Sequence, residues 1–496
     1  MRILLHILGL IVSFNLIAQE NKKIRILNAD YTFANEKKHP EYWRLVGNVS
    51  FQHNNSIMNC DSAFHYKKEN KILAFGKVYI QQGDSISLKG DKLYYFGKEN
   101  KIDINGDVIL IDRYMKLETD QLYYNIKTNI GSYKNHGVII DNEKTIQSKK
   151  GSYNANLYMF NFTDSVKVLG KDYNIITNNM KYNTKSEIAY FSGPSYIISN
   201  KKTIYAEKGW YNTKYDIAEL RDKSYIETKE YLLKSDTLYY HKNKGYAKAI
   251  NNVKIYNTTE NITIYGGLAE YLELENKIFV SKRPVMELPF KEDTIFIHAQ
   301  KFFIEQENKK KDILAYNKVK FFSEDIQGKS DSLSYSINDS TIEIYKKPII
   351  WANDFQITAD SIKLLVYDKE IKQMFLKKSP IIISQYDSID FNQIKGKEMI
   401  VYFNKNNINR VDISGNGQSI FIVEDDKDEK IGLNYIESTD ISLFFKEKKL
   451  HDITYHITPT STTTPLHQLK EKEHYLKGIN WREKERPKAR EDIFIE

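Results

Sequence analysis

The sequence predicts an all-β protein, an elongated and repetitive antiparallel β-jellyroll or β-solenoid-like rod. A motif recurs at intervals of about 30 residues through most of the chain, for about thirteen units in one register. Within each unit apolar and polar residues alternate, which is typical of half-buried strands. The composition agrees, because 36 tyrosines and 24 phenylalanines stand against 9 prolines in 496 residues. A unit of this size cannot bury an apolar face alone, so successive units are expected to stack around one continuous interior.

Two anchors define each unit of the repeat. The first is a strand of the form G-x-V-x-φ, with φ a bulky apolar residue, as in residues 47–51 and 76–80. The second is a segment ending D-x-φ-x-Y or φ-Y-Y, as in residues 61–66 and 91–95. Because the side chains of a strand alternate between its two faces, the apolar residues of the first anchor are expected to share the interior face. The same register continues at Val138, Val166, Ser195, Ser224, Val253, Val285, Val319, Ile349, Ile381 and Gly417.

The residue types that could carry chemistry argue against an enzyme. Aspartates recur in the second anchor, but a calcium solenoid would carry them in glycine-rich nonapeptides, which these units lack. We therefore expect them to make hydrogen bonds at turns or strand starts. The 11 histidines have no ligand spacing, and no nucleophile-elbow, zincin or P-loop motif is present. The sequence thus predicts no catalytic residue, metal site or cofactor. A polysaccharide-acting β-helix enzyme remains an alternative, because its acidic and basic groups would meet only in the folded chain.

The N-terminus predicts export. Residues 1–18 combine a charged start, an apolar run to Ile17 and a small residue, Ala18, which is the pattern of a cleaved secretory signal peptide. Cys60 is the only cysteine, so no internal disulfide is expected, and we predict that it fills the core. The formal net charge is +8, with lysine and glutamate interspersed and no arginine-rich patch. This pattern indicates solvated strand faces and no nucleic-acid partner.

The sequence predicts three segments after the signal peptide. Residues 19–455 form the repeat array, and residues 456–477, which begin with a Thr/Pro-rich stretch, form a linker. Residues 478–496 form a C-terminal tail that either caps the last unit or docks on a partner, because an exposed tail would have little reason to hold large apolar side chains. The candidate docking residues are Trp481, Arg482, Arg486, Pro487 and Phe494.

The iterated anchors behind a signal peptide resemble the OstA-like family, named for organic solvent tolerance. That family includes the periplasmic lipopolysaccharide transport protein LptA and the N-terminal domain of the outer-membrane translocon LptD. The resemblance is strongest over residues 24–211 and weakens toward Phe445. The chain is longer than a typical LptA and carries no recognisable C-terminal barrel sequence, so it looks more like the long OstA-like proteins of Bacteroidetes.

The resemblance implies a non-enzymatic, exported carrier that shields the acyl chains of lipopolysaccharide in an apolar groove within the periplasm. It also implies partners, namely OstA-like domains of an outer-membrane translocon and an inner-membrane export complex, with end-to-end self-association as a further possibility. Association with the outer membrane would then run through these partners. A structural or adhesive rod with a closed core is the alternative, since both require the same alternation. The candidate groove-lining residues are Val49, Phe51, Val78, Ile80, Val108, Leu110, Val138, Ile140, Val166 and Val168.

Overall fold

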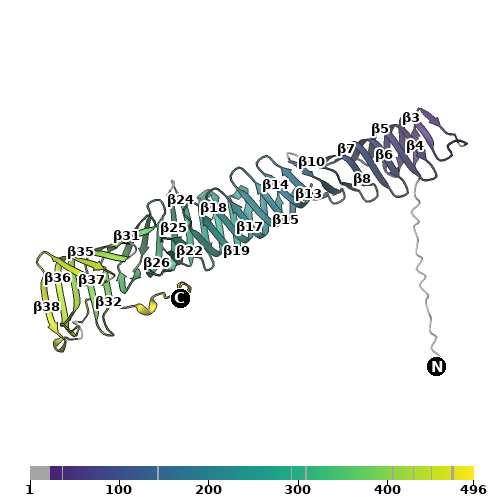
Figure 1. Cartoon of the computed structure of the whole chain (residues 1–496). Coiled ribbons are helices and arrows are strands. Elements are labelled where there is room, and N and C mark those ends of the chain that lie inside the picture. The colour runs from purple at the N-terminus through teal and green to yellow at the C-terminus, as the bar shows by residue number, and fades with distance from the viewer. Residues whose placement is uncertain are drawn as a thin grey trace, which may run out of the picture. The chain divides into compact units, whose positions relative to one another are not determined.

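The structure is a computed structural model of the chain. It describes residues 23–35, 37–141, 144–291, 293–307, 310–404, 407–427, 429–447, 449–470 and 474–495. The predicted signal peptide lies outside these residues. The chain divides into two compact units, unit 1 (Met1–Ala189) and unit 2 (Tyr190–Glu496). Each unit is a stack of short antiparallel strands (Figure 1).

The predicted all-β antiparallel fold is confirmed: the described residues form 38 strands and a few short 3-10 turns, with no α-helix among them. The strands that begin in unit 1 are β1 (Arg25–Asn28), β2 (Tyr31–Phe33), β3 (Trp43–His53), β4 (Ser56–Tyr66), β5 (Lys71–Gln82), β6 (Ile86–Phe96), β7 (Lys101–Asp112), β8 (Met115–Asn125), β9 (Ile130–Tyr133), β10 (Gly137–Asp141), β11 (Lys144–Ser148), β12 (Lys150–Asn154), β13 (Met159–Leu169), β14 (Asn174–Asn183) and β15 (Ile188–Ile198).

Unit 2 continues the same pattern and adds the 3-10 turns. Its strands are β16 (Thr203–Asn212), β17 (Ile217–Glu227), β18 (Tyr231–His241), β19 (Tyr246–Asn257), β20 (Thr263–Leu272), β21 (Lys277–Ser281), β22 (Val285–Pro289), β23 (Thr294–His298), β24 (Lys301–Glu307), β25 (Lys310–Phe322), β26 (Ile326–Ser336), β27 (Thr341–Tyr345), β28 (Ile349–Ala352), β29 (Phe355–Thr358), β30 (Ser361–Tyr367), β31 (Glu370–Lys377), β32 (Ile381–Gln385), β33 (Phe391–Lys395), β34 (Glu398–Asn404), β35 (Asn407–Glu424), β36 (Lys430–Lys446), β37 (Lys449–His456) and β38 (Thr460–Pro465). The turns are η1 (Lys242–Lys244), η2 (Glu273–Glu275), η3 (Leu466–Gln468), η5 (Glu483–Glu485) and η6 (Arg490–Phe494).

A two-residue corner bends every second long strand, as in β3, β5 and β7. In β3, Gly47 and Asn48 have φ angles of +80° and +44°, and both stand opposite the single residue Asp61 of β4. Such a two-against-one bulge turns the strand and increases its twist. Left-handed residues mark the corners at Gly47, Gly76, Gly106, His136, Asp164, Gly193, Asp222, Asn251, Lys282, Asn317, Lys346, Lys378 and Gly415.

The corners divide the strands of unit 1 between two facing walls, and the apolar side chains of both walls point into the space between them. Wall A contains residues 49–53, 56–60, 78–82, 86–90, 108–112, 115–119, 137–141, 144–148, 166–169 and 174–177. Wall B contains residues 43–46, 62–66, 71–75, 92–96, 101–105, 121–125, 130–133, 150–154, 159–163 and 179–183. Each long strand therefore belongs to both walls, and the chain itself closes the corner side.

The recurring aspartates sit against the corners, which explains why the two anchors repeat together. A Cβ added to Gly76 would lie 2.5 Å from Asp61 Oδ2, and one added to Gly106 would lie 2.5 Å from Asp91 Oδ2. At Asn48 the corner side chain donates to Asp30 Oδ2 at 2.9 Å. The aspartates were predicted to act at turns, and in the structure each of these aspartates packs against the next corner along the chain.

The predicted linker needs correction. Residues 460–465 of the Thr/Pro-rich stretch form β38, which pairs antiparallel with residues 432–437 of β36. Threonine is a good strand former, and the two prolines lie at residue 459, before the strand, and at its last residue, 465, where the ladder tolerates them. One continuous array over residues 19–455 stays a prediction.

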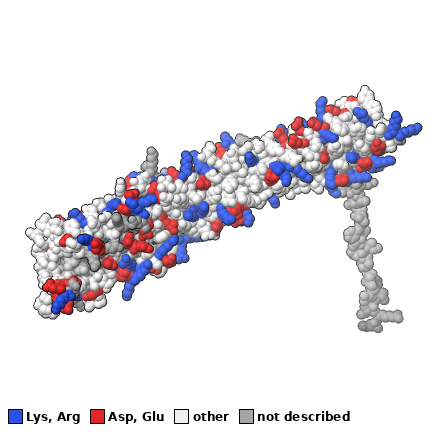
Figure 2. All heavy atoms as spheres, in the orientation of Figure 1, with Lys and Arg blue, Asp and Glu red and all other residues white. Residues whose placement is uncertain are grey.

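Figure 2 shows acidic and basic side chains interspersed on the visible surface of the chain, as the composition predicts.

Replacing Gly76 by alanine tests the corner directly. The variant combines a left-handed φ of +73° with a Cβ that overlaps Asp61. We therefore expect its free energy of unfolding to fall by more than the roughly 1–2 kcal/mol that a left-handed conformation alone costs. Gly83→Ala is the matched control, because φ there is +55° and the nearest atom to its Cβ is 3.9 Å away. Urea unfolding measures both variants. Equal losses would contradict a steric role for Asp61, and adding Asp61→Ala should recover part of the Gly76→Ala deficit.

Candidate functional site

The space between walls A and B of unit 1 is the candidate site, and most predicted lining residues point into it. Each of these is at most 2% exposed: Val49, Phe51, Val78, Ile80, Val108, Leu110, Val166 and Val168. Wall B faces them with apolar side chains of its own, including Leu45, Ala63, Ala74, Leu93, Ile104 and Leu122, each also at most 2% exposed. The interior is therefore apolar on both walls.

Two predicted lining residues are wrong. Val138 is half-buried and Ile140 is 39% exposed, whereas Ile139 between them is 0% exposed. The prediction aligned Val138 with Val49 of the first repeat, but the left-handed corner residue is His136, directly before Gly137, with φ of +62°. Gly137 is consequently the first inward residue, and every later side chain of β10 changes face.

A row of tyrosine hydroxyls joins the free edges of walls A and B on the side opposite the corners. We call this row the tyrosine seam; it consists of Tyr95, Tyr124, Tyr153 and Tyr182 of wall B with the partners His53, Gln82, Asp112 and Asp141 of wall A. The donors follow their partners by 42, 42, 41 and 41 residues. All of these residues are buried except Gln82, which is half-buried.

The geometry of the seam is uniform along unit 1. The Tyr124 hydroxyl donates to Gln82 Oε1 at 2.9 Å, and the Tyr153 hydroxyl donates to Asp112 Oδ2 at 2.6 Å. Tyr182 donates to Asp141 Oδ2 at 2.6 Å, and Tyr95 is hydrogen-bonded to His53 Nδ1. The seam therefore encloses the interior with side chains alone.

Burial fixes the protonation state of the seam. It raises the pKa of Tyr95, Tyr124 and Tyr153 far above the usual value, so these hydroxyls stay protonated and remain donors. Burial also raises the pKa of Asp141, against the opposing effects of the Tyr182 hydrogen bond and the nearby Lys144. Lys144 forms an ion pair with Glu187 beside the same end of the seam.

Sequence reasoning missed the seam, although a signal exists. The last tyrosine of the second anchor recurs every 29 residues at an inward position, where a hydroxyl needs a partner, although only Tyr95 and Tyr124 stand in a φ-Y-Y segment. The partners are His, Gln, Asp and Asp, so no single residue type marks them. Only the spacing of 41–42 residues connects donor to acceptor.

The C-terminal tail folds back over unit 2, and its Ile479 packs on Ile420 of β35 and Leu433 of β36. It contacts the outer face of wall A of unit 2. From residue 285 onward this wall contains residues 285–289, 294–298, 319–322, 326–330, 349–352, 355–358, 381–385, 391–395, 417–424, 430–438 and 460–465. Figure 1 shows this segment beside β32 and β26. The tail thus adds a third layer to one side of unit 2.

The predicted docking residues are engaged with this wall. Trp481 packs on Ile381, Ile383 and Phe391, with its ring centroid 5.4 Å from that of Phe391. The Phe494 ring lies 4.3 Å from the Arg283 guanidinium.

The remaining three docking residues are also held. Arg482 forms an ion pair with Glu485. Arg486 Nε donates to Gln327 Oε1 at 2.8 Å, and Pro487 is buried.

Two buried glutamines hold the backbone of residues 474–482, which join the end of the predicted linker to the start of the tail. Gln393 Nε2 donates to the carbonyl of His474 at 2.6 Å, and its Oε1 accepts from the N–H of Leu476 at 2.8 Å. Gln356 repeats this arrangement with the carbonyl of Asn480 and the N–H of Arg482, both at 2.7 Å. Both glutamines are 0% exposed. Their amides are satisfied by the tail, so the face is shaped to receive it.

The sequence contains a signal for this face that the alternation analysis did not use. Residues 348–352 and 380–383 are apolar at every position, and Ile381, Ile382 and Ile383 are all buried. A strand that is apolar on both faces must be covered on both. Consecutive isoleucines therefore mark the segments that the tail covers.

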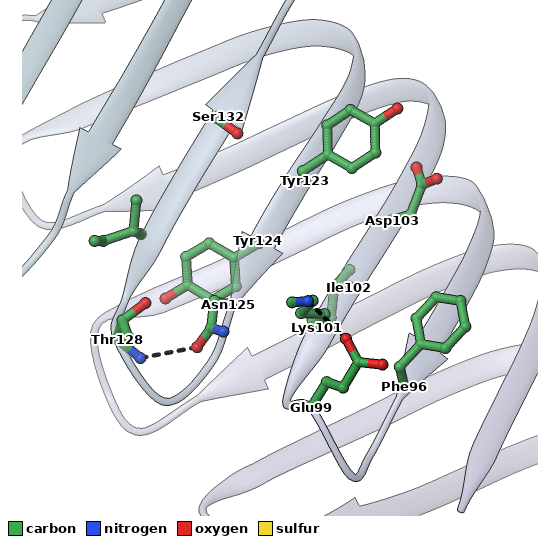
Figure 3. A pocket seen from close by; sticks show the side chains of 11 residues that line it. Phe96, Glu99, Lys101, Ile102, Asp103, Tyr123, Tyr124, Asn125, Thr128 and Ser132 are labelled. Atoms are coloured by element: carbon green, nitrogen blue, oxygen red, sulfur yellow. Dashed lines mark hydrogen bonds and ion pairs between the residues drawn. The ribbon is translucent and has the colours of Figure 1, made fainter. Parts of the chain in front are cut away.

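A shallow surface depression of about 440 Å³ lies beside the turns that follow β6 and β8 (Figure 3). The rings of Phe96 and Tyr123 and the carboxylate of Asp103 line it. Two other lining residues form an ion pair, with Lys101 Nζ 2.6 Å from Glu99 Oε2.

In the described part of the chain, no group of three or more His, Cys, Asp or Glu side chains could hold a metal ion. Over the same residues, no helix is long and apolar enough to cross a membrane.

The arrangement is that of a repetitive antiparallel β-protein with an enclosed apolar interior, and comparison with known proteins agrees with the predicted resemblance. Residues 21–178 and 171–236 match the family described as OstA-like protein. The predicted resemblance is thus confirmed over residues 21–236.

Solved structures also match the chain. One is the crystal structure of LptH, described as the LptA homologous periplasmic component of the conserved lipopolysaccharide transport device from Pseudomonas aeruginosa. It is 18% identical, with 22% of this chain and 81% of LptH covered and a TM-score of 0.20. No curated protein matches the chain.

Asp141→Asn should remove one contribution to the pH dependence of stability. Because burial raises the pKa of Asp141, the folded state binds this proton more tightly than the unfolded state. The stabilisation is complete below the unfolded pKa of about 3.9 and is lost as pH rises through the folded pKa. Asparagine keeps an acceptor for Tyr182, so the variant should lose less stability than wild type between pH 4 and pH 7.

Urea unfolding at several pH values measures this difference. Asp164→Asn is the control of opposite sign, because a hydrogen bond from Ser165 lowers the pKa of that exposed carboxyl. Parallel pH profiles for wild type and Asp141→Asn would contradict the account.

Changing Gln356 and Gln393 together to leucine should release the tail. Each hydrogen bond contributes about 0.5–1.5 kcal/mol net, and four would be lost with partners left unpaired. Amide hydrogen exchange in residues 474–482 should become faster, while exchange in β35 and β36 stays slow. Gln385→Leu is the control, because its amide bonds the carbonyl of Asp387 and not the tail. Unchanged exchange in the double variant would show that apolar contacts alone hold the tail.

Proposed function

We propose that the chain is a non-enzymatic periplasmic bridge that binds and transports lipopolysaccharide, with acyl chains between walls A and B and sugars and phosphates in water. The observation that carries the proposal is the coincidence of the OstA-like match over residues 21–236 with an interior that is apolar on both walls. The enclosed space offers acyl chains the environment that they lack in an aqueous compartment.

The energetics favour such a carrier. Each acyl CH₂ transferred from water to an apolar environment gains about 0.8 kcal/mol. Because successive repeats present nearly the same lining, a lipid has a similar free energy at adjacent positions along the interior. A lipid can therefore move from one repeat to the next without being held in a deep free-energy minimum. The contacting residues that we assign are the eight inward residues of the predicted set together with Ile139.

Partner chains are assigned to the ends of the array. Among the described residues, β1 pairs only with β3, and β38 pairs only with β36. Each of these strands leaves a backbone edge to which another chain can add hydrogen bonds. The partners that we infer are OstA-like domains of an outer-membrane translocon and an inner-membrane export complex, with self-association by the same edges. The predicted signal peptide supports export.

The second candidate function is a structural or adhesive rod. Its support is the close burial of the lining residues, several of which, such as Phe51 and Leu45, are 0% exposed. A closed core of this kind needs no lipid. The tail does not separate the two candidates, because its docking residues are engaged with unit 2 and would reach a partner only after leaving it.

Photo-crosslinking in cells separates the carrier from the rod. A photoreactive amino acid replaces Phe51 or Val108, which point inward, and in matched controls it replaces Ser50 or Ile109, which alternate with them on the outer face. The carrier account predicts lipopolysaccharide adducts at the inward positions and few at the outward ones. Equal labelling on both faces, or labelling only by neighbouring protein, would favour the closed rod.

A further inference from the structure

The outer face of wall B in unit 1 is hollowed beside the turns that follow β6 and β8. This hollow is the surface depression of about 440 Å³ shown in Figure 3, and we call it the wall B depression. Phe96, Asp103 and Tyr123 line it from three neighbouring strands, β6, β7 and β8. Its volume falls within the roughly 300–1,000 Å³ that is usual for sites that bind small molecules.

The depression forms because β7 carries a short side chain and a tethered one between two strands that carry rings. Asp103 stands opposite Tyr123 in the ladder between β7 and β8, and Lys101 stands opposite Phe96 in the ladder between β6 and β7. Lys101 is held by Glu99 of the preceding turn, with Nζ 2.6 Å from Oε2. Room is therefore left above β7, with an aromatic ring on either side of it.

Both rings are accessible, and each is restrained by a lysine from outside the depression. Phe96 is 36% exposed and Tyr123 is 38% exposed. Lys71 Nζ lies 5.5 Å from the centroid of the Phe96 ring, and Lys134 Nζ lies 5.6 Å from that of Tyr123. Neither lysine lines the depression. Because a cation is attracted to an aromatic ring, these contacts hold the rings in place without filling the space between them.

The carboxylate of Asp103 is fixed in orientation and keeps one oxygen available. Asn105 Nδ2 and Gln121 Nε2 both donate to Oδ1, at 2.9 Å and 2.8 Å. Within the part of the chain that the structure describes, no donor is bonded to Oδ2 of Asp103. A carboxylate accepts hydrogen bonds more strongly than a neutral group does. Oδ2 can therefore accept a hydrogen bond from a ligand hydroxyl.

We propose that the wall B depression binds a neutral saccharide, with a sugar ring between Phe96 and Tyr123 and a sugar hydroxyl that donates to Asp103 Oδ2. A sugar ring presents apolar C–H faces, which pack on aromatic rings, and hydroxyls at its edge, which need polar partners. Because Lys101 is already paired with Glu99, the charge of Asp103 disfavours phosphates and other anions. A single carboxylate supplies too few ligands for a metal ion.

The inference is independent of the proposed lipid-carrying function, because the depression lies on the outside of wall B. The same chemistry is offered by the sugar part of a glycolipid and by a free glycan. The experiment therefore includes both sources.

Saturation-transfer difference NMR on the full chain tests the inference. The neutral probes are maltotriose, cellotriose and chitotriose, and a further probe is the polysaccharide that mild acid releases from lipopolysaccharide without acyl chains. Trigalacturonic acid is the anionic comparison. The variants are Tyr123→Ala and Asp103→Asn. Tyr190→Ala is the matched control, because Tyr190 is 41% exposed and lies outside the depression. Urea unfolding checks that each variant is folded.

We expect the wild-type protein and Tyr190→Ala to bind at least one neutral probe or the released polysaccharide at millimolar concentration. Tyr123→Ala should weaken this binding roughly three- to tenfold, because one aromatic contact is lost. Asp103→Asn should weaken it roughly fivefold, because a neutral acceptor replaces a charged one. Binding of the released polysaccharide alone would identify a glycolipid as the source, and binding of the neutral oligosaccharides would identify free glycans. Binding of none of these probes, equal binding by all variants, or preference for trigalacturonic acid would overturn the inference.

Discussion

The left-handed corner is the constraint on which the rest of the structure depends. Two residues with positive φ oppose one residue of the neighbouring strand, so a long strand turns without leaving its ladder. Each strand then contributes to both walls, and alternation places the apolar residues of both halves inside. Because an aspartate of the preceding strand packs on the corner, the corner and the second anchor must repeat together. The interior, its closed back and its side-chain seam all follow from this one bend.

The enclosed interior is held with unequal strength on its different sides. Backbone ladders and continuous chain close three sides, while the tyrosine seam closes the fourth with buried, protonated hydroxyls. Unit 2 adds a different device, a tail bound to the outside of wall A by buried glutamines that bond its backbone. The two features are independent, because the tyrosine seam joins the free edges of walls A and B in unit 1, whereas the tail covers the outer face of wall A in unit 2.

Much of the fold could be predicted because the alternation reports directly on burial. Val49, Val108 and the other correctly placed lining residues follow from the repeat alone. The error at Val138 arose because the repeat was aligned with Val138 in the place of Val49, whereas the corner at His136 makes Gly137 the first inward residue, and a shift of one residue reverses the faces of a strand. The seam and the tail site were not predicted, since both depend on contacts between residues about 40 or more than 80 positions apart and of mixed type. The three consecutive isoleucines at residues 381–383 did carry a local signal for a doubly covered strand.

The central claim is that the interior between walls A and B receives acyl chains. The most direct measurement is a double electron–electron resonance distance between spin labels at residues 54 and 100, on opposite sides of the tyrosine seam, with and without saturating lipopolysaccharide. The account predicts a longer and broader distance distribution when lipid is bound, with no change for labels at residues 128 and 156 along one edge. An unchanged distribution across the seam in protein that demonstrably holds lipid would contradict it.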